Sequence, residues 1–473
     1  MRPSWLALTR ADLPLLVGGG VLTIGMVFAS QRAGETLSIG GLVGLTLFCL
    51  FVVGFMALPY LAVAVTVPIF ALIPAVKVLA VPWIGPFKDL ITFAAITAAA
   101  ILIVQRAGEG HHQRGDFWVA AATFFLIGLY ILNLGGAMQR DVAWFQGVRL
   151  MLEPLGLLLA GMVLGSARRT LRWACASLIA TGVFVAVVGV VQQVLGGWRL
   201  VELGYSWTLQ VRTINGHLRS FGTMDEPFGY AAFLLLALTA VIFWMRRGPL
   251  VLVLGSVIIT GLAFSYVRSA AIVSLALVGL WLARTHRTTI AAFLVVLSIT
   301  LAASILIWSS SGSESRTVRT GPSLFLTING RTEAWRVVLD DPQTWLTGKG
   351  VGEVGTAAER ATYSVSRDER DEEDASAVDS GYFSLIADVG LAGLVIFLLL
   401  AGRLMALARD AIGRGLVAGW LAAGWLAVLL LDAVTRDSFT GFPSAFLGML
   451  LLGVALAAAA EERDSSRAVT AHR

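Results

Sequence analysis

Residues 229–245, GYAAFLLLALTAVIFWM, form an uncharged apolar stretch of nearly the length that crosses a membrane as one helix. Such a helix needs about 20 apolar residues, and similar stretches recur along almost the whole chain. Hydrophobic residues make up 57% of the 473 residues, and charged residues make up only 14%. Soluble domains carry about 25% charged residues, so the sequence predicts an all-α polytopic membrane protein.

The apolar stretches predict 12 to 14 transmembrane helices. They lie near residues 13–30, 40–57, 59–76, 89–105, 117–133, 147–164, 173–193, 229–245, 250–266, 270–283, 290–308, 383–402, 416–432 and 444–460. Two regions leave the count open, because 40–76 could hold two helices or a re-entrant arrangement and 250–283 is nearly continuous. No small-residue cleavage site follows the first stretch, so it is not expected to be a removable signal.

The positive charges of the short loops predict the orientation in the membrane, since Lys and Arg concentrate in cytoplasmic loops. With 14 helices, all of the arginine-rich short loops fall on one face together with both termini. Their arginines are Arg106, Arg114, Arg168, Arg169, Arg172, Arg246, Arg247, Arg284, Arg287, Arg403, Arg409 and Arg414. That face is the expected cytoplasmic side of the plasma (inner) membrane. Because the net charge of +5 comes from scattered arginines and not from one basic surface, a nucleic-acid partner is excluded.

The sequence predicts four parts: two sets of transmembrane helices, a long polar loop between them and a C-terminal tail. Residues 1–308 are expected to hold eleven transmembrane helices with short loops, and 309–380 one large extracytoplasmic loop. Residues 381–460 are expected to hold the C-terminal transmembrane helices, and 461–473 a cytoplasmic tail. The run of charges at 368–374 is expected to be a solvated loop tip, because it lacks the glycine turn of a calcium loop.

Although Lys and Arg concentrate on the cytoplasmic side, five cations are expected on the outer face. They are Lys88, Arg149, Arg219, Arg268 and Arg331. Like charges at one membrane surface repel one another unless an anion joins them, and a guanidinium presents a planar fork of donors that suits phosphate oxygens. The sequence therefore predicts that these side chains bind a lipid diphosphate whose tail lies between helices. The alternative is that each cation reaches the interface alone or pairs locally, as Arg149 could with Glu153.

The segment 331–352 predicts an amphipathic helix followed by a turn. Trp335 and Val338 recur at helical spacing, so the helix is expected to lie along the membrane interface. The Asp-Pro pair at 341–342 is expected to end it. The alternating glycines of 348–352 permit either a close backbone turn over a ligand or a flexible connector.

Several short motifs resemble those of the O-antigen ligases and the related Wzy-type polysaccharide polymerases. They are Arg219-Ser220-Phe221-Gly222-Thr223 with Pro227, Ser265-Tyr266-Val267-Arg268-Ser269-Ala270, Arg331 with Trp335, Gly348-x-Gly350-x-Gly352, and Asp379-Ser380-Gly381-Tyr382-Phe383-Ser384-Leu385 followed by Gly390-Leu391-Ala392-Gly393. Their order and their shared side of the membrane carry the resemblance. It covers residues 215–400 in motifs and the rest of the chain in hydropathy alone.

The resemblance implies a GT-C-like fold with a large periplasmic loop. It implies a membrane glycosyltransferase that moves a glycan from an undecaprenyl-diphosphate carrier to a glycan or glycolipid acceptor, with no cofactor and no metal. Arg268 and Arg331 would then hold the diphosphate, with Arg219 in support. The ligases usually carry a histidine where this chain has Asp379, whereas Asp or Asn there is more similar to the polymerases. Ligation and polymerisation both stay open.

Transfer to a sugar hydroxyl needs a base, or a group that orients the hydroxyl. Asp379 is the first candidate, because it lies where the long loop re-enters the membrane; its alternative role is that of a helix N-cap. His217 is the second candidate, since it is the only histidine expected on the outer face and histidines titrate near neutral pH. Asp225 and Glu226 are the third.

A transporter or flippase of lipid-linked glycans is the alternative function. Transporters place ionisable residues near the middle of the membrane on broken helices. Here the acidic residues near or within predicted spans are few, namely Glu153, Asp388 and Asp432, and most other charges lie at span ends. This distribution favours chemistry at the outer surface. A structural scaffold, a third possibility, would leave the outer arginines unexplained.

Overall fold

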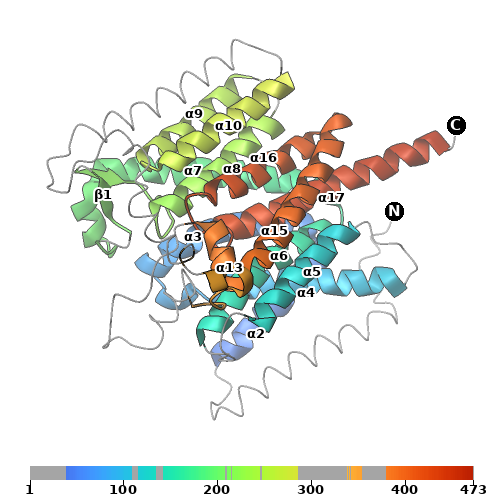
Figure 1. Ribbon diagram of the computed structural model, residues 1–473. Helices are drawn as coiled ribbons and strands as arrows, with labels where there is room; N and C mark the ends of the chain where they lie inside the picture. Colours follow the sequence, from blue (N-terminus) through green and yellow to red (C-terminus); the bar gives the residue numbers. More distant parts are fainter. Residues whose placement is uncertain are drawn as a thin grey trace.

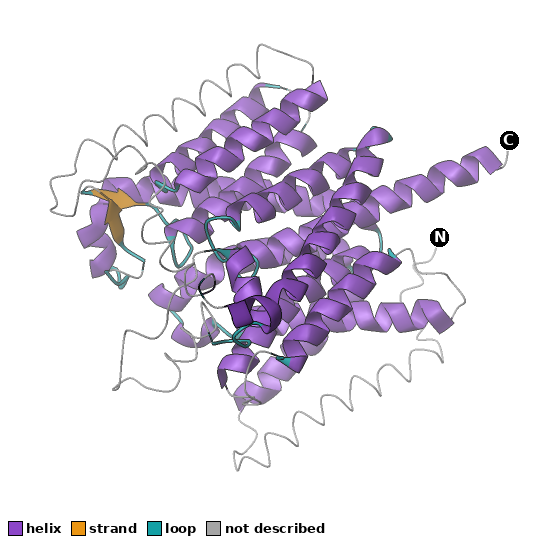
Figure 2. Cartoon of the chain, viewed as in Figure 1, coloured by secondary structure: helices purple, strands orange, loops and turns teal. Residues whose placement is uncertain are grey.

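The computed structural model describes residues 39–108, 116–134, 142–207, 210–214, 216–245, 248–285, 338, 340, 342–353 and 380–471. These residues form a bundle of helices with one small two-stranded hairpin at its edge (Figure 1; Figure 2). Seven of the described helices are long and apolar enough to cross a membrane, and five shorter helices are also apolar. The all-helical, polytopic architecture predicted from the sequence is confirmed.

The predicted spans correspond closely to the helices of the structure. These are α2 (Ile39–Ala57), α3 (Pro59–Leu79), α4 (Phe87–Gly108), α5 (Phe117–Leu132), α6 (Val142–Val163), α7 (Ala167–Glu202), α8 (Pro227–Trp244), α9 (Pro249–Phe264), α10 (Arg268–Thr285), α13 (Pro342–Thr347), α15 (Gly381–Gly413), α16 (Val417–Asp432) and α17 (Ser444–Ala471), with a 3-10 turn η1 (Pro82–Ile84). The stretch 40–76 is two helices, because Pro59 begins α3 at a position where its missing N–H costs nothing. The spans predicted at 13–30 and 290–308 lie outside the described residues.

Helices α8 and α17 form the interior of the bundle. Within their apolar windows 89% of α8 and 83% of α17 is buried, whereas the other long helices bury 39 to 56%. Glycines bring α17 close to α6, since a Cβ on Gly161 would lie 2.4 Å from the carbonyl oxygen of Leu450 and one on Gly453 would lie 2.3 Å from that of Leu158. Small residues that let two backbones approach are typical of helix packing within membranes.

Two of the long helices are interrupted at glycines with left-handed backbone angles. The φ of Gly196 in α7 is 76°, and that of Gly390 in α15 is 72°. After α7 the chain forms two antiparallel strands, β1 (Arg212–Ile214) and β2 (His217–Arg219), with Arg212 opposite Arg219. This hairpin is an addition to the predicted all-helical fold. Each strand has only three residues, which is too short for an alternating pattern to stand out in the sequence.

Candidate functional site

The described candidate residues lie at one end of the bundle, the end at which α8, α10, α15 and α17 begin. We call it the outer end, because the sequence predicts that it faces away from the cytoplasm. Lys88 lies there because its Nζ is 4.9 Å from the ring centroid of Phe446 near the start of α17. The hairpin lies there because Ser220 donates its backbone N–H to the carbonyl of Phe264, 2.8 Å away, just before α10. Two candidates, Arg331 and Asp379, lie outside the described residues.

The hairpin joins the loop between α9 and α10 and brings three candidates to one place. The Nε of Arg219 donates a hydrogen bond of 3.2 Å to the carbonyl of Ser265. The ring of His217 stacks on that of Tyr266, with centroids 6.2 Å apart and planes 17° from parallel. Arg268, which is partly buried, begins α10 two residues later. His217, Arg219 and Arg268 therefore converge on one short junction, although they come from two separate segments; we call them the junction group.

Two glutamines of α7 hold the loop that follows Arg219. The side-chain oxygen of Gln192 accepts the backbone N–H groups of Phe221 (3.0 Å) and Gly222 (2.8 Å). The Nε2 of Gln193 donates to the carbonyl of Leu218 at 2.8 Å and to the hydroxyl of Ser220 at 2.7 Å. The sequence analysis missed both glutamines. Their signal was available, because two adjacent amides stand out in an otherwise apolar span and buried amides are normally hydrogen-bonded.

Lys88 and Arg149 form a second group, in which each cation meets carboxylates. Lys88 contacts Asp89, and its Nζ lies 3.4 Å from Glu153. Arg149 lies 3.4 Å from Asp89 through Nη1 and 3.6 Å from Glu153 through Nε. The local pair that the sequence allowed, Arg149 with Glu153, is therefore present. A diphosphate would have to compete with two carboxylates for these two cations, and we call the four residues the paired group.

Arg436 is a cation of the outer end that the sequence analysis missed. Its Nη2 lies 3.1 Å from Glu226, just before α8, and its Nη1 lies 3.6 Å from Asp432 at the end of α16. Its backbone carbonyl accepts the N–H of Gly381 at 2.8 Å, at the start of α15. The missed signal is the one applied to the other cations, since Arg436 lies in the connection between two predicted spans on the outer side. Glu226, a third-choice base, is thus held in an ion pair.

The start of α15 is fixed at the residues that follow Asp379. Ser380 is the N-cap of the helix, and its hydroxyl donates to the carbonyl of Ala433 at 3.2 Å. The N–H of Gly381 also donates to Ala433, at 2.9 Å. The alternative role of Asp379 as the N-cap is therefore wrong: Ser380 has the extended backbone of a cap, and Asp379 precedes it.

The glycine turn at 348–352 packs against α15 instead of acting as a flexible connector. The carbonyl of Ala387 accepts the N–H groups of Lys349 (2.7 Å) and Gly350 (3.3 Å). One expectation for the preceding helix needs correction, and one is extended. Val338 is fully buried and packs on Ala387, so this residue does not face the membrane interface. The expected end of that helix at 341–342 agrees with the bend at Asp340, and Pro342 begins the short helix α13, because proline fits the first helical position.

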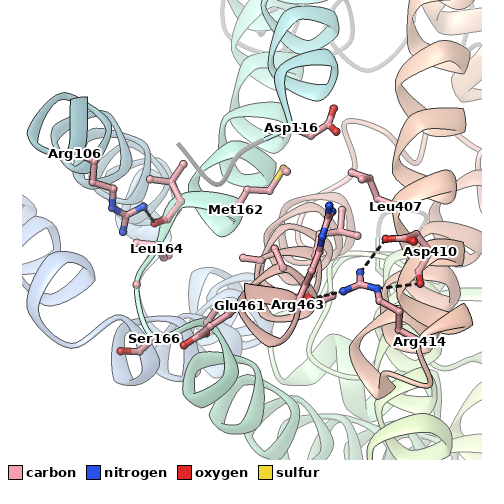
Figure 3. Close-up of a pocket in the computed structure, with 17 residues that line it drawn as sticks. Arg106, Asp116, Met162, Leu164, Ser166, Leu407, Asp410, Arg414, Glu461 and Arg463 are labelled. Carbon is pink, nitrogen blue, oxygen red and sulfur yellow. Dashed lines mark hydrogen bonds and ion pairs between the residues drawn. The ribbon is translucent and has the colours of Figure 1, made fainter. Parts of the chain in front are cut away.

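A cavity of about 580 Å³ lies at the opposite end of the bundle, at the far ends of α4, α6, α15 and α17 (Figure 3). Two of the arginines that line it form local contacts. Arg106 donates to the carbonyl of Val163 at 2.8 Å, and Arg414 pairs with Asp410 at 3.0 Å. The guanidinium of Arg403, hydrogen-bonded to Asp116 at 3.1 Å, lowers the pKa of that carboxyl. These are the residues expected of a cytoplasmic face, and they lie far from the junction group along the helices.

The described ranges contain no cluster of three or more His, Cys, Asp or Glu side chains arranged as metal ligands would be. Residues 250–398 match the family described as O-antigen ligase, Wzy_C. The matched range contains Arg268, Arg331 and Asp379, whereas the hairpin with His217 and Arg219 precedes it. A comparison with curated proteins gave no match.

Proposed function

Because residues 250–398 form a domain of the O-antigen ligase family, which is a family of enzymes, we propose that the chain is a membrane glycosyltransferase. It takes a glycan from an undecaprenyl-diphosphate carrier and joins it to a sugar hydroxyl of a glycan or glycolipid acceptor. The observation that carries the proposal is the junction group. There Arg219, from outside the family domain, hydrogen-bonds Ser265 inside it, three residues before Arg268.

In the proposed reaction the acceptor oxygen attacks the first carbon of the glycan, and the bond from that carbon to the diphosphate breaks. Negative charge then grows on the leaving diphosphate. Arg219 and Arg268 stabilise that charge, and Arg331 completes the group from the long loop. Donors that are already oriented stabilise a developing charge more strongly than water does. The hydrogen bond from Arg219 to Ser265 and its position 4.7 Å over the ring of Phe228 fix the direction of one guanidinium.

The proton of the acceptor hydroxyl passes to a base. Asp379 is proposed first, because it precedes the anchored Ser380 at the start of α15. His217 is the second candidate, because its stacking on Tyr266 places it in the junction group. We assign both to the extracytoplasmic face, because the arginine-rich short loops predict that the other face is cytoplasmic. Both termini are then in the cytoplasm.

The alternative, a flippase of lipid-linked glycans, is disfavoured by the partners of the acidic residues in the spans. Glu153 pairs with Lys88, Asp388 accepts a hydrogen bond from Tyr130, and Asp432 accepts one from Ser438. Each of these carboxylates has a partner that explains its presence. A transport mechanism would need such groups to release and rebind protons or ions.

Transfer and flipping are distinguished by whether a bond breaks. Purified protein in detergent is mixed with lipid-linked glycan and acceptor lipids, both extracted from membranes of cells that lack the protein. The transferase releases free undecaprenyl diphosphate, measured by mass spectrometry, and does so after treatment with EDTA. Protein in vesicles that moves the donor across the bilayer without releasing the carrier would contradict the proposal.

A further inference from the structure

The interruption of α15 at Gly390 leaves the carbonyl groups of the preceding turn without their usual helical partners. One of them, the carbonyl of Ala387, accepts the two N–H groups of Lys349 and Gly350. The broken helix thus offers acceptors to a segment that returns from the long loop. The glycine turn at 348–352 is docked by hydrogen bonds of its own backbone.

Every backbone N–H from Gly348 to Glu353 has a partner. The N–H groups of residues 348, 349, 350 and 353 donate to carbonyls. That of Val351 donates to the side chain of Asn133 at 2.7 Å, and that of Gly352 donates to Asp388 Oδ1 at 3.4 Å. Irregular backbone at membrane depth is tolerated only where protein satisfies it, and this turn meets that condition.

Glycines on both sides make the fit close. A Cβ on Gly348 would lie 2.7 Å from the carbonyl oxygen of Asp388, and one on Gly390 would lie 2.4 Å from that of Leu346. Both glycines also have positive φ, 80° and 72°. The two segments therefore touch backbone to backbone, and the contact has little freedom to slide.

Asp388 connects this contact to a third element. Its side chain is buried, with Oδ1 on Gly352 and Oδ2 accepting the hydroxyl of Tyr130 at 3.0 Å. Tyr130 belongs to α5, and Asn133, the C-cap that follows this helix, binds Val351. One carboxylate thus joins α5, the glycine turn and α15.

We propose that Asp388 is a positioning residue that holds the glycine turn at 348–352 against α15 and the end of α5, in the part of the chain that links Arg331 to Asp379 in the sequence. Val338 is buried against Ile386 and Ala387, so a second residue of the same stretch packs at this position of α15. Arg331 lies seven residues before Val338, and Asp379 lies just before α15. The inference rests on the proposed function, because it assigns both residues to one reaction.

The test compares three variants with the wild type and with Thr239→Val, a control that removes a buried hydroxyl bonded within α8. Asp388→Ala removes both acceptors. Tyr130→Phe removes one donor and is the milder change if the alanine variant folds poorly. Asp388→Asn keeps the contacts, because its amide oxygen can accept from Gly352 and its amide N–H can donate to the hydroxyl of Tyr130.

Two readouts are taken on each protein: hydrogen exchange of the peptide that covers 348–353, and carrier release in the transfer assay. Asp388→Ala should speed exchange in that peptide and lower kcat/KM by about 10- to 100-fold, since a misplacement of about 1 Å can cost 100-fold. Tyr130→Phe should show both effects to a smaller degree. Asp388→Asn should match the wild type in exchange, in turnover and in the pH profile of turnover.

Unchanged exchange or unchanged turnover in Asp388→Ala overturns the proposal. An inactive Asp388→Asn whose turn exchanges like the wild type overturns it as well, because ionisation and not position would then matter. A wild type that releases no carrier contradicts the proposed function itself, and the exchange data then decide alone whether Asp388 docks the turn.

Discussion

The two groups of cations at the outer end differ in what they contact. In the paired group, Lys88 and Arg149 meet Asp89 and Glu153, so two positive charges face two negative ones. In the junction group, Arg219 binds a neutral carbonyl and lies over an aromatic ring, and it does so across two segments. An outer position alone therefore does not identify a phosphate ligand. The carboxylates beside Lys88 and Arg149 identify two charges that support the fold.

Removal of Arg268 should have the largest effect. Arg268→Ala is expected to lower carrier release by at least about 100-fold, the usual cost of losing one oriented donor to a developing negative charge. Arg268→Lys should keep part of the activity, because it restores the charge without the fork. Arg199→Ala is the matched control. The side chain of Arg199 is 73% exposed, and its described ion pair is with Glu202, one helical turn away. Equal turnover of Arg268→Ala and Arg199→Ala would remove Arg268 from the mechanism.

Replacement of the candidate bases should have the next largest effect on transfer. Asp379→Asn is expected to slow transfer by about 100-fold at neutral pH, within the range of general-base contributions. His217→Ala should slow it less, because stacking on Tyr266 gives His217 a positioning role if Asp379 takes the proton. Turnover at several pH values, measured on protein of equal folded amount, checks both. An active Asp379→Asn together with a dead His217→Ala would move the base to His217.

Sequence and structure agree best where an element is determined by its own residues and not by distant partners. An uncharged run such as 229–245 predicts a helix because lipid offers no other partner to the backbone. The hairpin could not be predicted in the same way, since Leu218 and the adjoining Ser220 are held by Gln193 and Phe264, which are distant in sequence. The expected helix end at 341–342 agrees with the bend at Asp340, but the sequence did not reveal that Pro342 also begins a new helix.

The sequence could predict which residues belong to the candidate site, but not which of them contact one another. The rule that outer cations are informative selected Arg219 and Arg268, and it also selected Lys88, because charge bias carries no information about partners. Asp89 follows Lys88 in the sequence, but only the fold places Glu153 against Lys88. The same rule should have selected Arg436, whose partner Glu226 lies more than 200 residues away in sequence.

The paired group should affect stability more than catalysis. Arg149→Ala leaves the buried Glu153 with one cation fewer, and we expect a loss of about 1 to 3 kcal/mol in the free energy of unfolding. This is less than for a fully buried pair, because 21% of the Arg149 side chain is exposed. Thermal unfolding in detergent measures the change. Carrier release per folded molecule should stay within about threefold of the wild type; a 100-fold loss would place Arg149 among the phosphate ligands.

The smallest effect is expected at the opposite end of the bundle. Arg403 lowers the pKa of Asp116, so the pair adds stability above the unfolded pKa of about 4 and loses it as the pH falls through the lower folded value. The contribution should stay below about 1 kcal/mol, because 42% of the Arg403 side chain is exposed. Thermal unfolding of wild type and Arg403→Ala between pH 3 and pH 7 tests this. A difference that grows towards acid pH would contradict it.

The junction group is tested most directly by a double-mutant cycle on the binding of undecaprenyl diphosphate itself. Kd is measured for wild type, Arg219→Ala, Arg268→Ala and the double variant. If both arginines hold one diphosphate, each single change weakens binding by about tenfold or more, and the two effects are coupled by about 1 kcal/mol or more. Effects that add to within about 0.3 to 0.5 kcal/mol, or binding that neither change weakens, would show that the two cations do not share a ligand.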